Sequence, residues 1–275
     1  MLKKLSTLGM TLFSVALLSL AAVALTADEI LDQMDAEADA LAEGSMISII
    51  RFDNVYSDGT TGSNLFGSLS IPNRSLIYFI EPTDVLGTVF LTHDFDEVGV
   101  DSRLWLFLPL LGLPKELVSE EERGGSFAGS SLSYSDLGDR NGGDRDYDSV
   151  LLGEESIVVG DLTRTAYKIE STAKPGADVD NPRSIIWIDT EFFIMLKAEA
   201  YNDLGNLATT TESLELGEFE GKLTMKVMLA TNHSEGSTTT ISFLEQRRPD
   251  VDIPAETFLP ENLHAFDAAF WGFIE

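Results

Sequence analysis

Three segments of the chain are apolar at every position, and this feature constrains the fold more than any other. They are Leu76–Ile80, Leu104–Leu108 and Ile185–Ile188, each of a length typical of a β-strand. A strand in a half-solvated antiparallel sheet alternates apolar and polar residues, because one of its faces meets water. Strands without this alternation must be covered on both faces. The cover is either protein on both sides, or protein on one side and a bound apolar ligand on the other.

The first 24 residues have the order of a secretory signal peptide. Lys3 and Lys4 precede an apolar run from Leu8 to Ala24, and small residues follow. We expect cleavage after Ala24 or Ala27 and a soluble protein in the periplasm. A transmembrane anchor is the alternative, but the run is shorter than the ~20 residues that span a bilayer.

The composition excludes several classes of protein. The chain has no cysteine, and therefore no disulfide, catalytic thiol, cysteine-bound zinc or lipid-modified cysteine. Its formal net charge is −28, which repels nucleic acid and anionic lipid headgroups. This acidity also fits a salty habitat. With 44% hydrophobic residues and 16 phenylalanines, the chain nevertheless has enough apolar side chains to fold around a core.

The local patterns predict one helix followed by many strands. Asp28–Glu43 has an apolar stripe at helical spacing, and Gly44 ends it. Short apolar segments separated by turn residues follow, and we expect strands over Met46–Tyr56, Leu65–Ile71, Leu76–Glu81, Phe192–Tyr201, Leu207–Leu216, Lys222–Thr231 and Thr238–Gln246. No linker or repeat divides the chain, so residues 28–275 form a single, mainly β domain. We expect a curved antiparallel sheet around an apolar cavity, with the helix lying across it.

Several blocks of the chain then arrive in the order of a known family. The chain resembles the LolA-like periplasmic carriers of outer-membrane lipoprotein sorting, in the branch linked to exporters, and the blocks that carry the resemblance are Tyr78–Pro82, Gly87–Leu91, Leu104–Pro109, Arg123–Phe127, Tyr134–Leu137, Trp187–Asp189 and Lys197–Asn202. The resemblance implies an open antiparallel half-barrel with helical lid elements that holds acyl chains without doing chemistry. It also implies an arginine that clamps the lid, for which Arg51 is the candidate. Leu110–Glu122 departs from the family by being acidic instead of basic.

Large apolar residues on the predicted strands are candidates for the cavity wall, and ordinary core packing is the alternative for each of them. Met225 and Met228 would suit a wall that adapts to different chains. The full set of wall candidates is Ile50, Phe52, Tyr78, Ile80, Phe90, Trp105, Phe107, Phe127, Trp187, Phe193 and Met195.

Two arginines are candidates for contact with a lid or a lipid headgroup. Arg51 lies among apolar neighbours, either facing inward with an acidic partner or facing outward into water. Arg123 begins the segment Arg123–Phe127, which is either a headgroup-binding rim or a tight structural turn.

Other motifs point away from chemistry. Asp139–Asp148 carries oxygen ligands at alternate positions but lacks the EF-hand order, so a solvated loop is favoured over a calcium site. His93, His233 and His264 share no metal-ligand spacing, and no nucleophile elbow or phosphate loop occurs. The tail Leu263–Ile274 has an apolar stripe at helical spacing that packs on the outside of the sheet, docks on a membrane partner or plugs the cavity.

The sequence therefore predicts a monomeric periplasmic carrier that takes up acyl chains of lipoproteins or lipids and moves them towards the outer membrane. No cofactor, metal or catalytic residue is expected. Its partners would be an inner-membrane exporter and an outer-membrane acceptor. The alternatives are an accessory subunit of an exporter with a filled interior, and a hydrolase with an unrecognised carboxylate pair.

Overall fold

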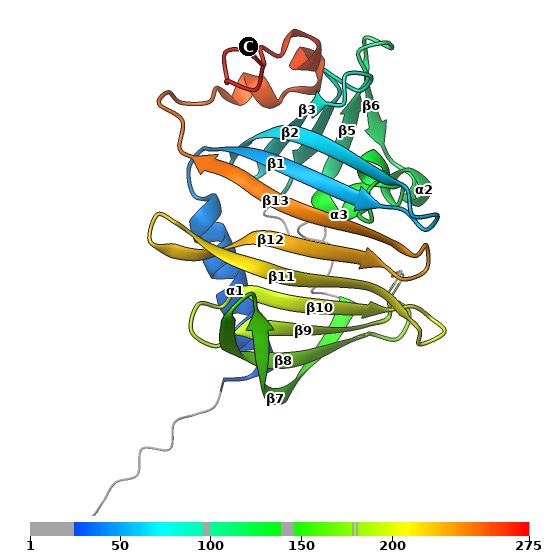
Figure 1. The fold of residues 1–275 in the computed structure, drawn as a ribbon, viewed down its shortest axis with the longest axis vertical. Helices are drawn as coiled ribbons and strands as arrows, with labels where there is room; N and C mark the ends of the chain where they lie inside the picture. The colour runs from blue at the N-terminus through cyan, green and yellow to red at the C-terminus, as the bar shows by residue number, and fades with distance from the viewer. Residues whose placement is uncertain (1–24, 96–99, 139–145, 178, 180, 275) are drawn as a thin grey trace, which may run out of the picture.

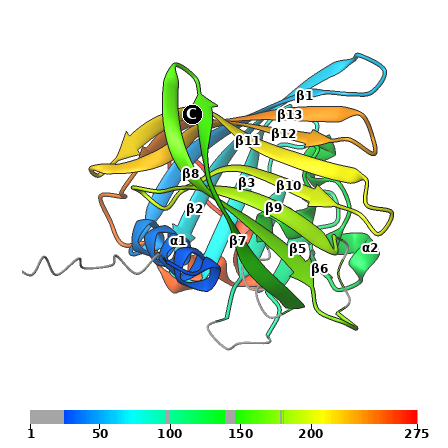
Figure 2. The same ribbon diagram turned by 90° about the horizontal axis from the view of Figure 1, so that it is seen from below.

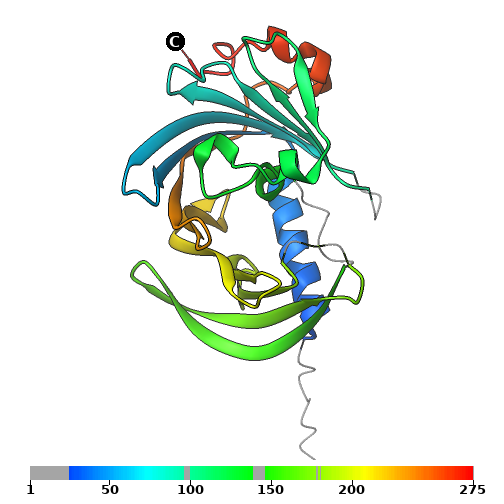
Figure 3. The same ribbon diagram turned by 90° about the vertical axis from the view of Figure 1, so that its right-hand side faces the viewer.

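The architecture is one curved antiparallel sheet with a helix across its open side (Figure 1, Figure 2, Figure 3). The structure is a computed structural model that describes residues 25–274 apart from 96–99, 139–145, 178 and 180. The expected signal peptide and most of the Asp139–Asp148 loop lie outside the described residues. Along the described residues, no helix combines the length and apolarity needed to span a bilayer.

The sheet contains thirteen strands in the order β6-β5-β4-β3-β2-β1-β13-β12-β11-β10-β9-β8-β7. Each strand pairs antiparallel with its neighbours, and β1 joins the two ends of the chain by pairing with β13. The strands are β1 (Met46–Val55), β2 (Thr61–Ile71), β3 (Arg74–Glu81), β4 (Val89–His93), β5 (Arg103–Phe107), β6 (Pro114–Leu117), β7 (Tyr147–Val159), β8 (Leu162–Ala173), β9 (Arg183–Asp189), β10 (Met195–Tyr201), β11 (Leu207–Phe219), β12 (Lys222–Asn232) and β13 (Ser237–Arg247).

Helix α1 (Ala27–Ala42) confirms the expected N-terminal helix. A capping box begins it: the Glu29 N–H donates to Thr26 Oγ1 at 3.2 Å, and the Thr26 N–H donates to Glu29 Oε2 at 2.8 Å. Gly44, with φ +84°, follows the helix and turns the chain into β1. The fully buried Ile30 anchors the first half of α1 against Ile169 and Ile188. We call the sheet face that meets α1 the inner face.

Short helices between β6 and β7 fill one end of the inner face (Figure 3). They are α2 (Glu120–Arg123), η1 (Phe127–Gly129) and α3 (Tyr134–Gly138). Phe127 is completely buried, and its ring centroid lies 5.3–6.0 Å from those of Phe52, Phe79 and Phe90. The segment therefore packs into the inner face through one aromatic side chain.

The C-terminal segment covers the outer face of β1–β5, above the sheet in Figure 1. It contains the 3₁₀ helices η3 (Ala255–Phe258) and η4 (Pro260–Ala265) and continues as turns, so the apolar stripe of Leu263–Ile274 begins in a 3₁₀ helix and packs on the sheet. Phe273 lies directly on Gly67, where an added Cβ would be 2.3 Å from the phenyl ring. The tail packs on the sheet through Phe258, Leu263 and Phe273.

These coverings explain the strands that are apolar on both faces. On β3 and β5 the C-terminal segment covers one face and the Phe127 cluster the other. On β9 the inner face meets α1, while the outer face packs in a cluster with residues of β7 and β8. The β7–β8 turn reaches β11, since a Cβ on Gly160 would lie 3.2 Å from the Leu214 carbonyl oxygen. Protein thus covers most of all three segments on both sides, and Ile77 and Ile186 also border cavities at the inner face.

Candidate functional site

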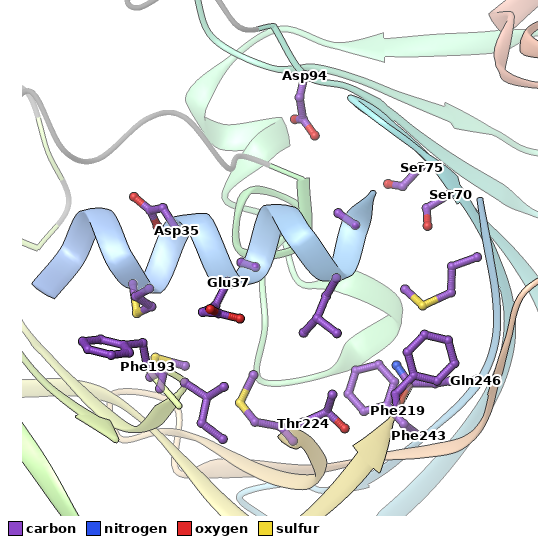
Figure 4. A pocket seen from close by; sticks show the side chains of 18 of the residues that line it. Asp35, Glu37, Ser70, Ser75, Asp94, Phe193, Phe219, Thr224, Phe243 and Gln246 are labelled. Atoms are coloured by element: carbon purple, nitrogen blue, oxygen red, sulfur yellow. The ribbon is translucent and has the colours of Figure 1, made fainter. Parts of the chain in front are cut away.

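An apolar cavity of about 450 Å³ lies between the second half of α1 and the inner face of the sheet (Figure 4). Met34, Ala38 and Leu41 form its helix side. Residues of the strands and of the β9–β10 turn complete the wall, and the apolar ones are Met46, Ile71, Phe193, Ile194, Met195, Phe219, Met225 and Phe243. Its volume lies in the range of small-molecule sites. Polar residues such as Ser70, Ser75 and Asp94 lie at one end of it (Figure 4).

A second cavity of about 320 Å³ adjoins the first. Phe127, Leu132 and Leu137 from the α2–α3 segment line it together with inner-face residues of β1, β2, β3 and β10–β13. Met195 and Phe243 line both cavities and therefore separate them.

Methionine is the residue that marks these walls. All five methionines of the described residues line one or both cavities: Met34, Met46, Met195, Met225 and Met228. A thioether chain is unbranched and polarisable, so it adapts to irregular apolar surfaces. The two cavities thus have walls that can adjust to different apolar molecules.

A third cavity of about 700 Å³ is larger but chemically different. It flanks the first half of α1, where Asp28, Asp32, Asp148 and Lys174 contribute charged groups. Leu31, Met34 and Ile186 also line it, but burying the charged groups beneath an apolar chain is costly, so the cavity suits an apolar ligand less well than the first two do. We therefore place the candidate site in the two apolar cavities.

Two cations hold α1 over the first cavity. Arg248 donates to the Leu41 carbonyl oxygen at 3.3 Å, at the helix end where carbonyls lack helical partners. It also pairs with Glu220 at 2.8 Å, which ties α1 to the β11–β12 turn. Lys222 pairs with Glu37 of the helix at 2.9 Å.

The β9–β10 turn that carries Phe193 is organised by Asp189. This carboxylate is fully buried, accepts from Arg164 at 2.7 and 2.9 Å, and accepts from the N–H groups of Glu191 and Phe192 at 2.9 Å. Burial raises the pKa of Asp189, but the bonds to Arg164 and the backbone outweigh it and leave the pKa lowered. The ionised carboxylate therefore fixes the turn that presents Phe193, with φ +51°, to the cavity.

The structure divides the expected wall residues between the two faces. Ile50, Phe52 and Phe127 line the second cavity, Phe193 lines the first and Met195 lines both. Phe90 packs beside Phe127 on the inner face. The other expected wall residues lie on the outer face, in packed clusters away from both cavities: Tyr78, Ile80, Trp105, Phe107 and Trp187.

The expected arginines do not meet at the cavity. Arg51 is exposed on β1, between Ile50 and Phe52, which face inward, so it points away from α1. Arg123 donates to the Ser102 carbonyl oxygen at 2.9 Å beside the Phe127 segment, as a structural turn requires. The helix contacts instead come from Arg248 and Lys222, which the sequence reasoning missed.

Other site residues were also missed, namely Met34, Met46, Phe219 and Phe243. The available signal was the placement of the methionines, which occur singly along segments that become the inner face. For Arg248 the signal was weaker: two adjacent arginines at the end of the last strand of a strongly acidic chain.

The three histidines lie apart and have different partners. His93 Nε2 is 2.6 Å from the Phe258 carbonyl oxygen, and His233 Nε2 is 2.8 Å from Thr210 Oγ1. His264 Nδ1 is 2.8 Å from the Glu261 carbonyl oxygen. Among the described residues, no group of three or more acids and histidines is arranged to hold a metal ion.

Comparison with known proteins defines the class of this fold. It is similar to a DUF1329 family protein from Desulfovibrio piger, with a TM-score of 0.75 and 23% identity over 86% of this chain and 98% of that one. A domain from Vibrio parahaemolyticus, named as a "putative outer membrane lipoprotein-sorting protein domain", gives a TM-score of 0.71 and 22% identity over 86% of this chain and 97% of that one. A LolA superfamily protein from Nitrosomonas europaea gives a TM-score of 0.63 and 20% identity over 86% of this chain and 98% of that one. The fold is LolA-like.

The family assignment rests on a match over most of the chain. A family model described as "Uncharacterized protein" matches residues 72–265, and the chain belongs to this family. Curated proteins give no match. The matched span begins at the end of β2 and ends in η4, so it includes most of the sheet and the start of the outer-face cover.

Proposed function

We propose that this protein is a periplasmic carrier that binds acyl chains of lipids or lipoproteins beneath α1 and transfers them towards the outer membrane. The observation that carries the proposal is the apolar cavity of about 450 Å³ between α1 and the inner face. The LolA-like fold supports it, as does the neighbour named for lipoprotein sorting. The signal-like start of the chain supports the periplasmic location.

Binding would use burial of hydrocarbon. Each methylene that leaves water for the cavity gains ~0.8 kcal/mol, so a long chain binds without directed polar contacts. The second cavity extends the space beyond Met195 and Phe243. No covalent step is required, and the carrier is not an enzyme. Release then depends on movement of α1, which Arg248 and Lys222 hold from the side of β11–β13.

The first test is native mass spectrometry on the mature protein purified from the periplasm without detergent, followed by lipid extraction. We expect co-purified lipid or acylated peptide, and binding of a fluorescent long-chain fatty acid after delipidation. A ligand-free mass together with no fatty-acid binding would contradict the carrier proposal and favour the accessory subunit.

A matched pair of variants locates the binding. Ala38→Trp fills the first cavity from its helix side, and we expect fatty-acid affinity to fall about tenfold, which is about 1.4 kcal/mol. Ala36→Trp makes the same change at an exposed helix position that does not line the cavity, and should bind as the wild type does. Equal affinities for the two variants would place binding elsewhere.

A further inference from the structure

The turn between β5 and β6 exposes an unusual concentration of apolar side chains. We call residues 108–113 the leucine loop. Leu110 is 100% exposed, Leu111 65% and Leu113 73%, and Val118 just beyond β6 is 75% exposed. Single exposed apolar residues are common on soluble proteins, but a cluster marks an interaction surface.

Part of the backbone of the leucine loop has its N–H groups bonded or lacks them. The N–H groups of Leu111 and Gly112 both donate to the Leu108 carbonyl oxygen, at 2.9 and 3.1 Å. Pro109 and Pro114 carry no N–H group. These four positions therefore bring no unbonded donor into an apolar phase, where each one would be costly.

Two ion pairs lie at the base of the leucine loop, and the exposed acids Glu120 and Glu121 lie close to them in the chain. Arg103 donates to Glu116 at 2.7 and 2.8 Å, and Lys115 pairs with Glu122. The hydrogen bond from Lys115, together with bonds from the backbone N–H groups of Val118 and Ser119, lowers the pKa of Glu122 to about 2. Glu122 therefore stays ionised above that pH. Paired charges of both signs match a zwitterionic headgroup layer, whereas the net charge of −28 opposes an anionic one.

We propose that the leucine loop inserts into the interface of a zwitterionic lipid bilayer. The leucine loop connects β5 to β6, an edge strand of the sheet (Figure 1), and its leucines are exposed. A bilayer takes up all of these side chains together, because it is fluid and needs no complementary groove. This docking uses the outside of the fold and does not depend on what the cavities hold.

The test is flotation of the full mature protein with phosphatidylcholine vesicles. We expect the wild type to float with the vesicles, and a Leu110→Ser, Leu111→Ser, Leu113→Ser variant to lose at least tenfold in partitioning. Leu204→Ser is the matched control, because Leu204 is 84% exposed on the β10–β11 turn. Phosphatidylglycerol in the vesicles should weaken binding. The triple variant should still bind fluorescent fatty acid, which separates this proposal from the carrier function.

The absence of cysteine allows a direct readout of insertion. An environment-sensitive fluorophore on Leu110→Cys should shift to the blue when phosphatidylcholine vesicles are added, and the same label on Leu204→Cys should not. The proposal is overturned by a wild type that stays with the soluble fraction, or by a triple variant that floats equally well. It is also overturned if vesicles leave the label at position 110 unchanged while sedimentation shows self-association through the loop.

Discussion

At the scale of single residues, Asp189 is the polar group on which the site depends most. It accepts two bonds from Arg164 and two from the backbone of the turn before Phe193, and it is fully buried. Removing one member of such a pair leaves an uncompensated charge and unbonded donors. The carboxylate therefore links the stability of the β9–β10 turn to the shape of the cavity.

Asp189→Ala should lower the free energy of unfolding by ~2–4 kcal/mol, somewhat less than for a fully buried pair because Arg164 is 22% exposed. Urea denaturation measures this change. Glu191→Ala removes the other carboxylate bound to Arg164, but Glu191 is 66% exposed, so it should cost less than ~1 kcal/mol. Similar losses for the two variants would disprove the special role of Asp189.

Phe243 divides the apolar space and should control ligand length. Phe243→Ala joins the two cavities, so we expect affinity to shift by several-fold towards the longest chains in a fatty-acid series measured by displacement. Phe219→Ala enlarges only the first cavity and serves as the control. An unchanged chain-length profile in Phe243→Ala would show that one ligand does not span both cavities.

At the scale of elements, α1 is a cover whose far end depends on Arg248. Arg248→Met removes the donor to Leu41 and the pair with Glu220. We expect faster amide hydrogen exchange along residues 35–42 and several-fold faster release of bound fatty acid in stopped-flow measurements. Arg247→Met is the control, because Arg247 bonds Glu245 and the Trp271 carbonyl instead. If both variants release ligand at the wild-type rate, α1 does not gate the cavity.

At the scale of the whole molecule, His93 joins the sheet to its C-terminal cover through Phe258. Burial is the largest influence and lowers the pKa of His93, with Arg74 and Arg103 acting in the same direction and the Phe258 bond opposing them. The folded state thus binds a proton less readily than the unfolded chain. The stability that neutral His93 contributes to the folded state is fully present above the ordinary pKa of 6.5, and it is lost as the pH falls below that value.

Acidification should therefore loosen the C-terminal segment. Between pH 7.5 and pH 5 we expect hydrogen exchange, corrected for its intrinsic pH dependence, to increase over residues 253–273 relative to the strands. His93→Gln removes the titrating group, so the corrected hydrogen exchange of residues 253–273 should then change little between pH 7.5 and pH 5. An equally steep profile in His93→Gln would assign the effect to other groups.

Local sequence was sufficient for α1 and for most of the strands, but not for β6, β7 and β8 or for the short helices α2 and α3. The helix before Gly44 and the strands between turn residues follow from spacing and capping, which act between residues close along the chain. The LolA-like fold class was also predictable, because ordered blocks of the sequence carry the resemblance and the structure confirms it. The single curved sheet agrees with the predicted strands and with the LolA-like fold class.

Only the tertiary structure decided which residues line the site. In a strand that is apolar on both faces, no alternation of apolar and polar residues marks the inner face. The prediction therefore assigned Trp105 and Trp187 to the cavity wall, whereas both lie on the outer face, one residue from an inward-facing position. The contacts of Arg248 join Leu41 and Glu220, which are far from it in sequence. Sequence alone thus determined α1, most of the strands and their apolar character, through local interactions. The face, the cavities and the partners of α1 required the distant segments to come together.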